Sequence, residues 1–146
     1  MSRFIRTAQV RKKNGPQAIG KSRGGQNTKI HLIVANDTTP ITFRLSPGQA
    51  GDDPQGRILL TELPEHYRDT NIFVAMDKAY EGDAIRSQIV SYGLISVLPP
   101  KSNRNEVERY FRRLKGFRRV FTRYDKLGVM YSSFVVFAMI CETLRE

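Results

Sequence analysis

Residues 28–35 alternate between hydrophobic and polar side chains, which predicts a half-buried strand. One face of this strand carries Ile30, Leu32 and Val34, and the other carries Lys29 and His31. Residues 41–45 alternate again, after turn-forming residues at 36–40. The two runs therefore predict an antiparallel hairpin.

Two further runs are mainly apolar, and the first of them is continuously so. Residues 72–76 (Ile-Phe-Val-Ala-Met) predict a strand that is buried on both faces and ends at Asp77. Residues 94–98 predict a third core strand, which the prolines at 99 and 100 end.

Four helices are predicted, and the first three begin near a residue that can cap a helix. These candidate caps are Asp52 or Asp53, Asp83 and Asn105. The helices are expected at 52–63, 84–92, 105–116 and 129–144. Because the last one is apolar almost all round, we expect it to be buried.

The order of these elements predicts an α/β fold with a mixed sheet. Residues 1–27 show no periodicity and are rich in glycine and cations, so we expect a basic, irregular arm there. Residues 28–146 would then form the folded domain.

Length and composition fit a single ordinary domain, since the chain has 146 residues of which 40% are hydrophobic. One cysteine, Cys141, excludes an internal disulfide and a cysteine-based zinc site. The longest apolar stretch, 134–141, is far shorter than the ~20 residues of a bilayer span. We therefore expect a soluble, intracellular protein in a reducing compartment.

Positive charge is concentrated in two segments around an acidic middle. The formal charge is +8 over 1–36, −4 over 37–100 and +7 over 101–126, within a total of +10. Aromatic residues interleave with the cations of the second segment, a pattern that favours contact with a nucleic-acid backbone. The candidate DNA-binding residues are Lys21, Arg23, Arg109, Arg112, Arg113, Lys115, Arg118, Arg119, Arg123 and Lys126.

Residues 15–22 match the phosphate-loop pattern G-x-x-x-x-G-K-[ST] in full. That motif works when it leaves a buried strand and enters a helix, whose N-terminal amides hold the phosphates. Here no apolar run precedes it and a predicted strand follows, so nucleotide hydrolysis is the weakest alternative.

Two carboxylates stand out by position. Asp77 follows a predicted core strand, at the edge where open α/β sheets place ligand sites. Glu108 lies beside the apolar stripe of the third helix, one turn before Arg112, and a simple surface ion pair would also explain it. His31 and His66 have no second histidine or cysteine at ligand spacing, so we interpret both as structural.

Several motifs occur in the order found in one enzyme family. They are Ile-Gly-Lys-Ser-Arg-Gly-Gly at 19–25, Thr-Lys-Ile-His at 28–31, Leu-Ser-Pro-Gly-Gln-Ala at 45–50, Met-Asp-Lys-Ala-Tyr at 76–80, Val-Leu-Pro-Pro at 97–100 and Val-Glu-Arg-Tyr-Phe-Arg-Arg-Leu-Lys at 107–115. From about residue 16 to its end, the chain resembles the catalytic domain of the DDE transposases of bacterial insertion sequences.

The resemblance implies a ribonuclease-H-like mixed sheet flanked by helices and a reaction that cuts and joins transposon DNA. Such enzymes use two divalent metals, Mg²⁺ or Mn²⁺, held by three acids. Asp77 would be the second acid and Glu108 the third, as catalytic residues and metal ligands. DNA would be the partner, with a homodimer or an upstream transposase fragment as a second partner, and the location would be the bacterial cytoplasm at the nucleoid.

The chain departs from the family pattern in ways that matter for activity. The first acid precedes the 19–25 motif in the family, but residues 1–36 contain no Asp or Glu. The strand that carries this acid and the N-terminal DNA-end-binding region are missing, and the segment before the helix of Glu108 is shortened. We therefore expect a chain that binds DNA and cleaves it poorly or not at all alone. A non-catalytic nucleic-acid-binding protein is the main alternative.

Overall fold

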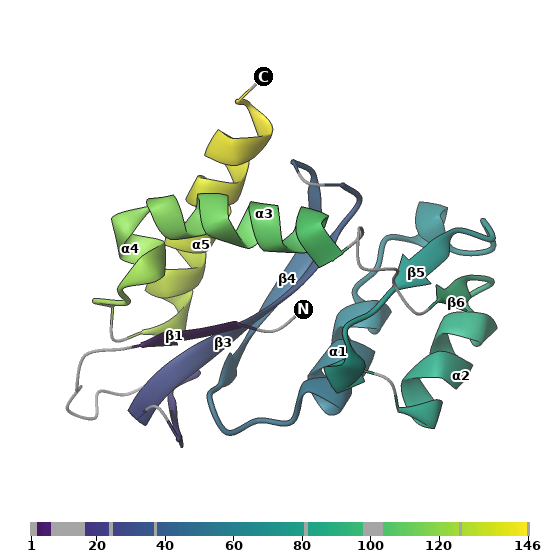
Figure 1. The fold of residues 1–146 in the computed structure, drawn as a ribbon, viewed down its shortest axis with the longest axis horizontal. Helices are drawn as coiled ribbons and strands as arrows, with labels where there is room; N and C mark the ends of the chain where they lie inside the picture. Colours follow the sequence, from purple (N-terminus) through teal and green to yellow (C-terminus); the bar gives the residue numbers. More distant parts are fainter. Residues whose placement is uncertain are drawn as a thin grey trace.

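A long antiparallel hairpin forms the centre of the molecule (Figure 1). The computed structural model describes residues 3–6, 17–23, 25–36, 38–80, 82–97, 104–125 and 127–145. The hairpin joins β3 (Gly25–Val34) to β4 (Pro40–Pro47), with Ile30 opposite Leu45. The predicted hairpin is thus confirmed, and both strands are longer than the alternating runs.

Two short strands extend this sheet within the segment predicted to be irregular. β1 (Arg3–Arg6) pairs antiparallel with β3, and β2 (Gly20–Ser22) pairs with the first residues of β3. The prediction of an irregular arm over 1–27 is therefore wrong for these two strands. Their pairing to β3, rather than any periodicity of their own, makes them strands.

The remaining strands form a second, smaller sheet. β5 (Phe73–Ala75) and β6 (Ile95–Val97) run parallel, with Val74 opposite Ser96. The two sheets are separate within the described residues. The 3₁₀ helices η1 (Glu65–Tyr67) and η2 (Lys78–Tyr80) flank β5 in sequence.

The helices are α1 (Asp52–Thr61), α2 (Asp83–Ser91), α3 (Arg104–Gly116), α4 (Arg118–Phe121) and α5 (Gly128–Thr143). Four of the described helices lie close to their predicted positions, and the short helix α4 was not predicted. The predicted capping residues are wrong, because glycines 51 and 82 occupy the N-cap positions of α1 and α2 without a side-chain cap. The aspartates instead lie in the first turn, where negative charge also favours the helix dipole.

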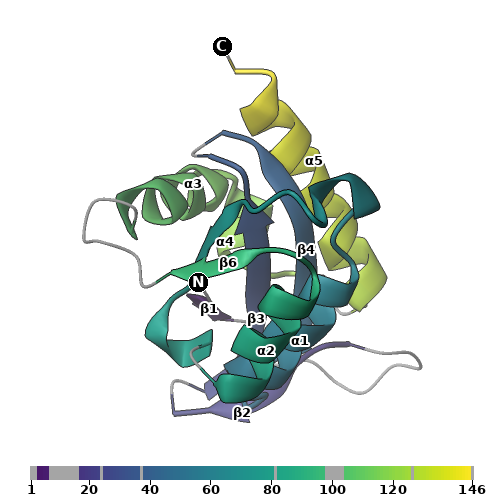
Figure 2. The same ribbon diagram turned by 90° about the vertical axis from the view of Figure 1, so that its right-hand side faces the viewer.

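Helices cover both faces of the large sheet, which confirms a mixed α/β architecture (Figures 1 and 2). On one face, Ile30 and Leu32 pack with buried side chains of α3, α4 and α5. On the other face, Ile33 and Ile41 pack against the cluster built by α1, α2 and Tyr80. The β3 strand therefore lies between two hydrophobic cores.

Three predictions of burial are corrected. The β3 strand is buried on both faces, since Lys29 and His31 are 6% and 0% exposed, rather than on one face alone. Conversely, the β5 strand is not enclosed, and Phe73 is 69% exposed. The α5 helix buries one face, which includes Tyr131 and Val135, and exposes apolar side chains on the other.

No helix in the described part of the chain is both long enough and apolar enough to cross a bilayer.

Candidate functional site

Asp77 lies two residues after the end of β5, where the chain turns into η2. Its carbonyl oxygen accepts a hydrogen bond from the backbone N–H of Tyr80 at 2.8 Å, which closes the turn, and Asp77 is half-buried. The sequence thus places this carboxylate correctly at the carboxyl end of a strand. The strand itself is shorter and more open than predicted.

A buried histidine ties this turn to the large sheet. His31 Nδ1 lies 2.7 Å from the Tyr80 hydroxyl, and Nε2 lies 2.7 Å from the Ser46 hydroxyl. Burial lowers the pKa of His31 to about 4. The negative charge of the nearby Asp52 acts to raise this pKa, and the positive charge of Lys29 acts to lower it further. The imidazole is therefore neutral at pH 7, and one of its nitrogens donates while the other accepts.

Lys29 and Asp52 form a second contact between β3 and α1. The Lys29 ammonium lies 2.8 Å from Asp52 and also donates to the Ala50 carbonyl at 2.7 Å. Both side chains are largely covered. Asp52, one of the predicted helix caps, is thus engaged in an ion pair that fixes the start of α1.

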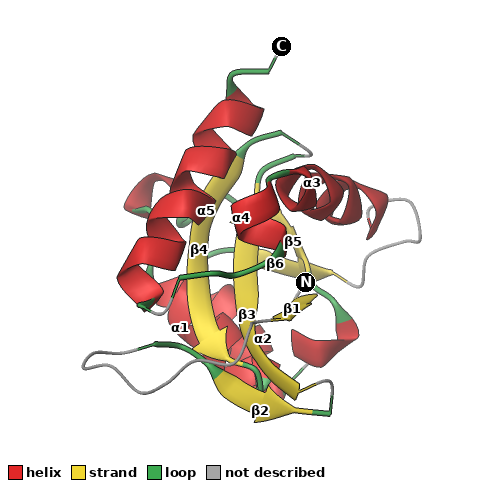
Figure 3. Cartoon of the chain, turned by 90° about the vertical axis from the view of Figure 1, so that its left-hand side faces the viewer, coloured by secondary structure: helices red, strands yellow, loops and turns green. Residues whose placement is uncertain are grey.

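Glu108 lies in the first half of α3, beside the buried stripe of the helix. Tyr110, Phe111 and Leu114 make that stripe and are at most 2% exposed. Glu108 is half-buried, and Arg112 is exposed one turn later. The α3 helix begins on the side of the molecule where β5 and β6 lie (Figures 1 and 3).

The predicted DNA-binding cations do not share one environment. Lys21 and Arg23 are exposed at and after β2, and Arg109, Arg112, Arg118 and Arg119 are exposed on α3 and α4. Arg113 and Lys115 are half-buried, and Lys126 lies outside the described residues. We call the exposed cations of α3 and α4, which are Arg109, Arg112, Arg118 and Arg119, the α3–α4 surface.

Arg123 is the exception, and its assignment as a DNA contact is corrected. Its side chain is 1% exposed and donates hydrogen bonds to Thr28 Oγ1, the Gln17 carbonyl and the Asp125 carbonyl. The guanidinium also lies 4.7 Å from the centre of the Tyr131 ring. Arg123 therefore fastens the start of β3 to the C-terminal helices and is not available to DNA.

The phosphate-loop match does not have the required fold. Residues 20–22 form strand β2, and the chain turns from Ser22 directly into β3 at Gly25. No helix follows the motif, so the amides that would hold a phosphate are not gathered. A nucleotidase built on this motif is excluded.

The carboxylates only partly fit a divalent metal. Asp77 and Glu108 offer oxygen ligands of the kind that Mg²⁺ and Mn²⁺ prefer. Within the described residues, however, no three His, Cys, Asp or Glu side chains come together as a metal site. The described residues therefore show no complete divalent-metal site, and no reaction step is built on them.

The described structure is thus a mixed α/β domain with Asp77 near the end of β5, Glu108 on α3 and exposed cations on α3 and α4, which fits a domain that acts on nucleic acid. The chain matches the family described as "Transposase DDE domain" over residues 2–130, and it belongs to this family. A role in DNA transposition follows. Members of this family generally use divalent metal ions.

A relative in Brucella ovis supports this membership. That protein is named as a transposase for insertion sequence element IS6501, and it is 30% identical over 133 residues, which cover 81% of this chain and 98% of the relative. The relative is therefore similarly short. No solved structure matches the chain with statistical significance.

The structural role interpreted for His31 is confirmed, but the sequence did not indicate that His31 and Arg123 are buried anchors. The alternation of 28–35 predicted a half-buried strand with Lys29 and His31 on its polar face. The same pattern is also compatible with a central strand that is buried on both faces. Arg123 was missed as an anchor because an Arg among other cations gives no local signal of burial.

Proposed function

We propose that this chain is the DNA-binding part of a ribonuclease-H-like transposase catalytic domain and that it does not cleave DNA by itself. The observation that carries this proposal is the incomplete acid set. Asp77 and Glu108 are present at a strand end and on a helix, and residues 1–36 contain no Asp or Glu to complete them.

The metals that such a domain binds would supply an activated hydroxyl and stabilise the leaving oxygen. Asp77 and Glu108 would be their ligands from this chain. The Tyr80–His31 contact would keep the turn that carries Asp77 in a fixed position on the sheet. A third carboxylate would have to come from an upstream segment or fragment.

DNA would lie along the α3–α4 surface. Arg109, Arg112 and Arg118 are exposed there, and a cationic surface of this kind binds phosphates irrespective of sequence. Binding of this type would also retain the protein at the nucleoid. A second copy of the chain could bind the other transposon end.

The binding part of the proposal is tested by salt dependence. We expect the double variant Arg109→Gln/Arg112→Gln to bind duplex DNA more weakly and to reduce the slope of log K against log salt by about 2. The matched control is Arg57→Gln/Arg86→Gln, which removes the same charge from exposed positions on α1 and α2. Equal losses in both double variants would show that only net charge matters and would refute a DNA site on α3.

The catalytic part is tested by strand nicking of supercoiled DNA in Mn²⁺. We expect the unmodified chain to produce no more nicked product than the double variant Asp77→Asn/Glu108→Gln. Metal-dependent nicking that is lost in each single variant would show that the chain is an active enzyme. If the chain binds DNA without nicking it, an upstream transposase fragment is added to the reaction. Restored cleavage would identify the chain as a transposase fragment, and continued absence of cleavage would favour another nucleic-acid-binding protein.

A further inference from the structure

Two exposed aromatic side chains lie among arginines at the end of α4. Phe121 and Tyr124 are 55% and 51% exposed. Arg118 and Arg119 are exposed on the same short helix as Phe121. A single exposed ring is ordinary on a protein surface. Two exposed rings interleaved with cations are instead typical of sites that hold single-stranded nucleic acid, where bases stack on the rings and phosphates lie on the cations.

Buried side chains hold the backbone that carries the two rings. Val120 and Arg123 are each 1% exposed, and each directly precedes one of the exposed rings. The Tyr131 hydroxyl donates to the Val120 carbonyl at 3.0 Å, and the Arg123 guanidinium donates to Thr28 at the start of β3. The rings are therefore presented from a backbone that is already ordered, which lowers the entropy cost of binding a ligand.

One of the neighbouring arginines is also held in place. The guanidinium carbon of Arg119 lies 4.5 Å from the centre of the Phe134 ring, and Nη1 lies 3.8 Å from an Asp125 carboxylate oxygen. The Arg119 side chain is nevertheless 57% exposed. Between residues 109 and 141 the sequence contains no acid besides Asp125. The chain around the two rings therefore carries a net positive charge, which suits an anionic ligand.

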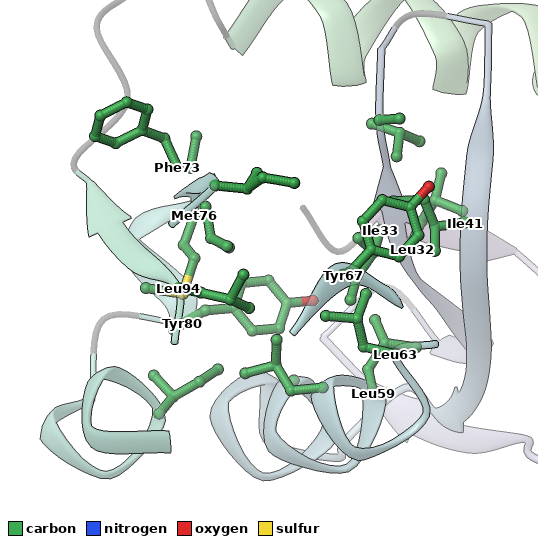
Figure 4. A pocket seen from close by; sticks show the side chains of 18 residues that line it. Leu32, Ile33, Ile41, Leu59, Leu63, Tyr67, Phe73, Met76, Tyr80 and Leu94 are labelled. Carbon is green, nitrogen blue, oxygen red and sulfur yellow. The ribbon is translucent and has the colours of Figure 1, made fainter. Parts of the chain in front are cut away.

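Two other exposed aromatic rings lie in apolar surroundings. Phe73 is 69% exposed and lines a groove of about 410 Å³ between the two sheets, and the described residues that line this groove are uncharged (Figure 4). Phe137 is 60% exposed on α5, where the sequence has no charged residue from 127 to 141. These two rings have the exposure without the positive charge, so they are matched controls for Phe121 and Tyr124.

We propose that Phe121 and Tyr124 form a stacking platform for unpaired DNA bases, with Arg118 and Arg119 on the adjacent phosphates. In a duplex the flat faces of the bases are covered by neighbouring base pairs, so a single strand or a frayed end is the form that fits. Every base has such a face, so the platform needs no particular sequence. This inference rests on the proposed function, because it specifies the form of DNA held at the α4 end of the α3–α4 surface.

The test compares binding of a labelled oligothymidylate and of a duplex of the same length by fluorescence anisotropy. The variant Phe121→Leu/Tyr124→Leu removes both aromatic faces and keeps the charge and the apolar character. We expect it to bind the single strand about tenfold or more weakly and to bind the duplex like the unmodified chain. The control Phe73→Leu/Phe137→Leu should bind both forms like the unmodified chain. The variant Phe121→Tyr/Tyr124→Phe keeps two rings and should keep the affinity for the single strand.

A second readout reports stacking directly. The fluorescence of a 2-aminopurine placed in the oligothymidylate changes when this base stacks on a ring, and we expect the change with the unmodified chain and its loss in Phe121→Leu/Tyr124→Leu. Circular dichroism checks that the variant is folded, and Tyr124→Leu alone replaces it if it is not.

Equal weakening of single-strand and duplex binding, or no weakening of either, would overturn the platform. So would a dimer in size-exclusion chromatography that the Leu variant dissociates, because a second copy would then cover the rings. The proposed function has its own readout, which is the weaker duplex binding of Arg109→Gln/Arg112→Gln. If that loss occurs while the Leu variant keeps its affinity for the single strand, the proposed function stands and the platform is rejected.

Discussion

The buried His31 makes the stability of this domain depend on pH. Its pKa is about 4 in the folded chain and 6.5 when the side chain is exposed to water. Between these values the unfolded chain binds a proton that the folded chain does not, so stability rises with pH across this interval and is lost as the pH falls. The full effect of this one group corresponds to about 3 kcal/mol.

The variant His31→Gln removes the titration and keeps a polar side chain beside Tyr80 and Ser46. At pH 7 we expect the free energy of unfolding of this variant to be about 1–3 kcal/mol lower than that of the unmodified chain, because a buried hydrogen bond is lost or distorted. Between pH 6 and 4.5 this difference should shrink by about 1.4 kcal/mol for each unit of pH. Other ionisable groups affect both proteins alike and cancel in the comparison.

Urea unfolding followed by far-ultraviolet circular dichroism at pH 7, 6, 5 and 4.5 measures these differences. The control variant is His66→Gln, which removes an exposed imidazole on η1. A gap between the unmodified chain and His31→Gln that stays constant from pH 7 to 4.5 would refute the reasoning. It would mean that His31 does not pass from a neutral buried form to a charged form on unfolding.

Three other substitutions test the packing around the site. Gly56→Ala would place a Cβ 2.5 Å from a ring carbon of Tyr80. The overpacking cost of about 1–3 kcal/mol should exceed the helix-propensity gain of about 1 kcal/mol, so the midpoint of urea unfolding should fall. A higher midpoint would show that the Tyr80 ring moves aside without cost. Arg123→Gln should cost about 3–5 kcal/mol, because it takes a buried donor away from the Gln17 and Asp125 carbonyls and the Thr28 hydroxyl. Thermal unfolding measures this loss, and an unchanged melting temperature would return Arg123 to the DNA-binding candidates. Phe137→Gln, at a position that is 60% exposed on α5, should change the free energy of unfolding by less than about 0.5 kcal/mol, and a larger, concentration-dependent loss would show that another copy covers this helix.

Elements with a strong period of their own were predictable from the sequence. The hairpin of β3 and β4 and the helices α1, α2, α3 and α5 all follow from spacing that repeats over seven or more residues or from clear turn chemistry. Strands β1 and β2 carry no such pattern in their three or four residues. They are strands because β3 offers hydrogen-bonding partners from a distant part of the chain.

Burial was the least predictable property, because it depends on which element lies opposite. The same apolar composition that marks β5 as a core strand leaves Phe73 largely exposed, since β5 lies at the edge of a two-stranded sheet. The α5 helix is apolar on nearly every side, yet only the side that meets α3, α4 and the hairpin is covered. Polar His31 is fully buried because α1 and η2 close over the second face of β3.

The sequence by itself determined the order of the hairpin and the four longer helices, the position of acids at 77 and 108 and the uneven distribution of charge. These are local properties, since they depend on residue type and on spacing along the chain. The tertiary structure alone decided that Arg123 is an internal anchor, that His31 supports the turn of Asp77 and that a groove separates the two sheets. Each of these depends on contacts between residues that lie far apart in sequence, and no pattern within a single segment encodes them.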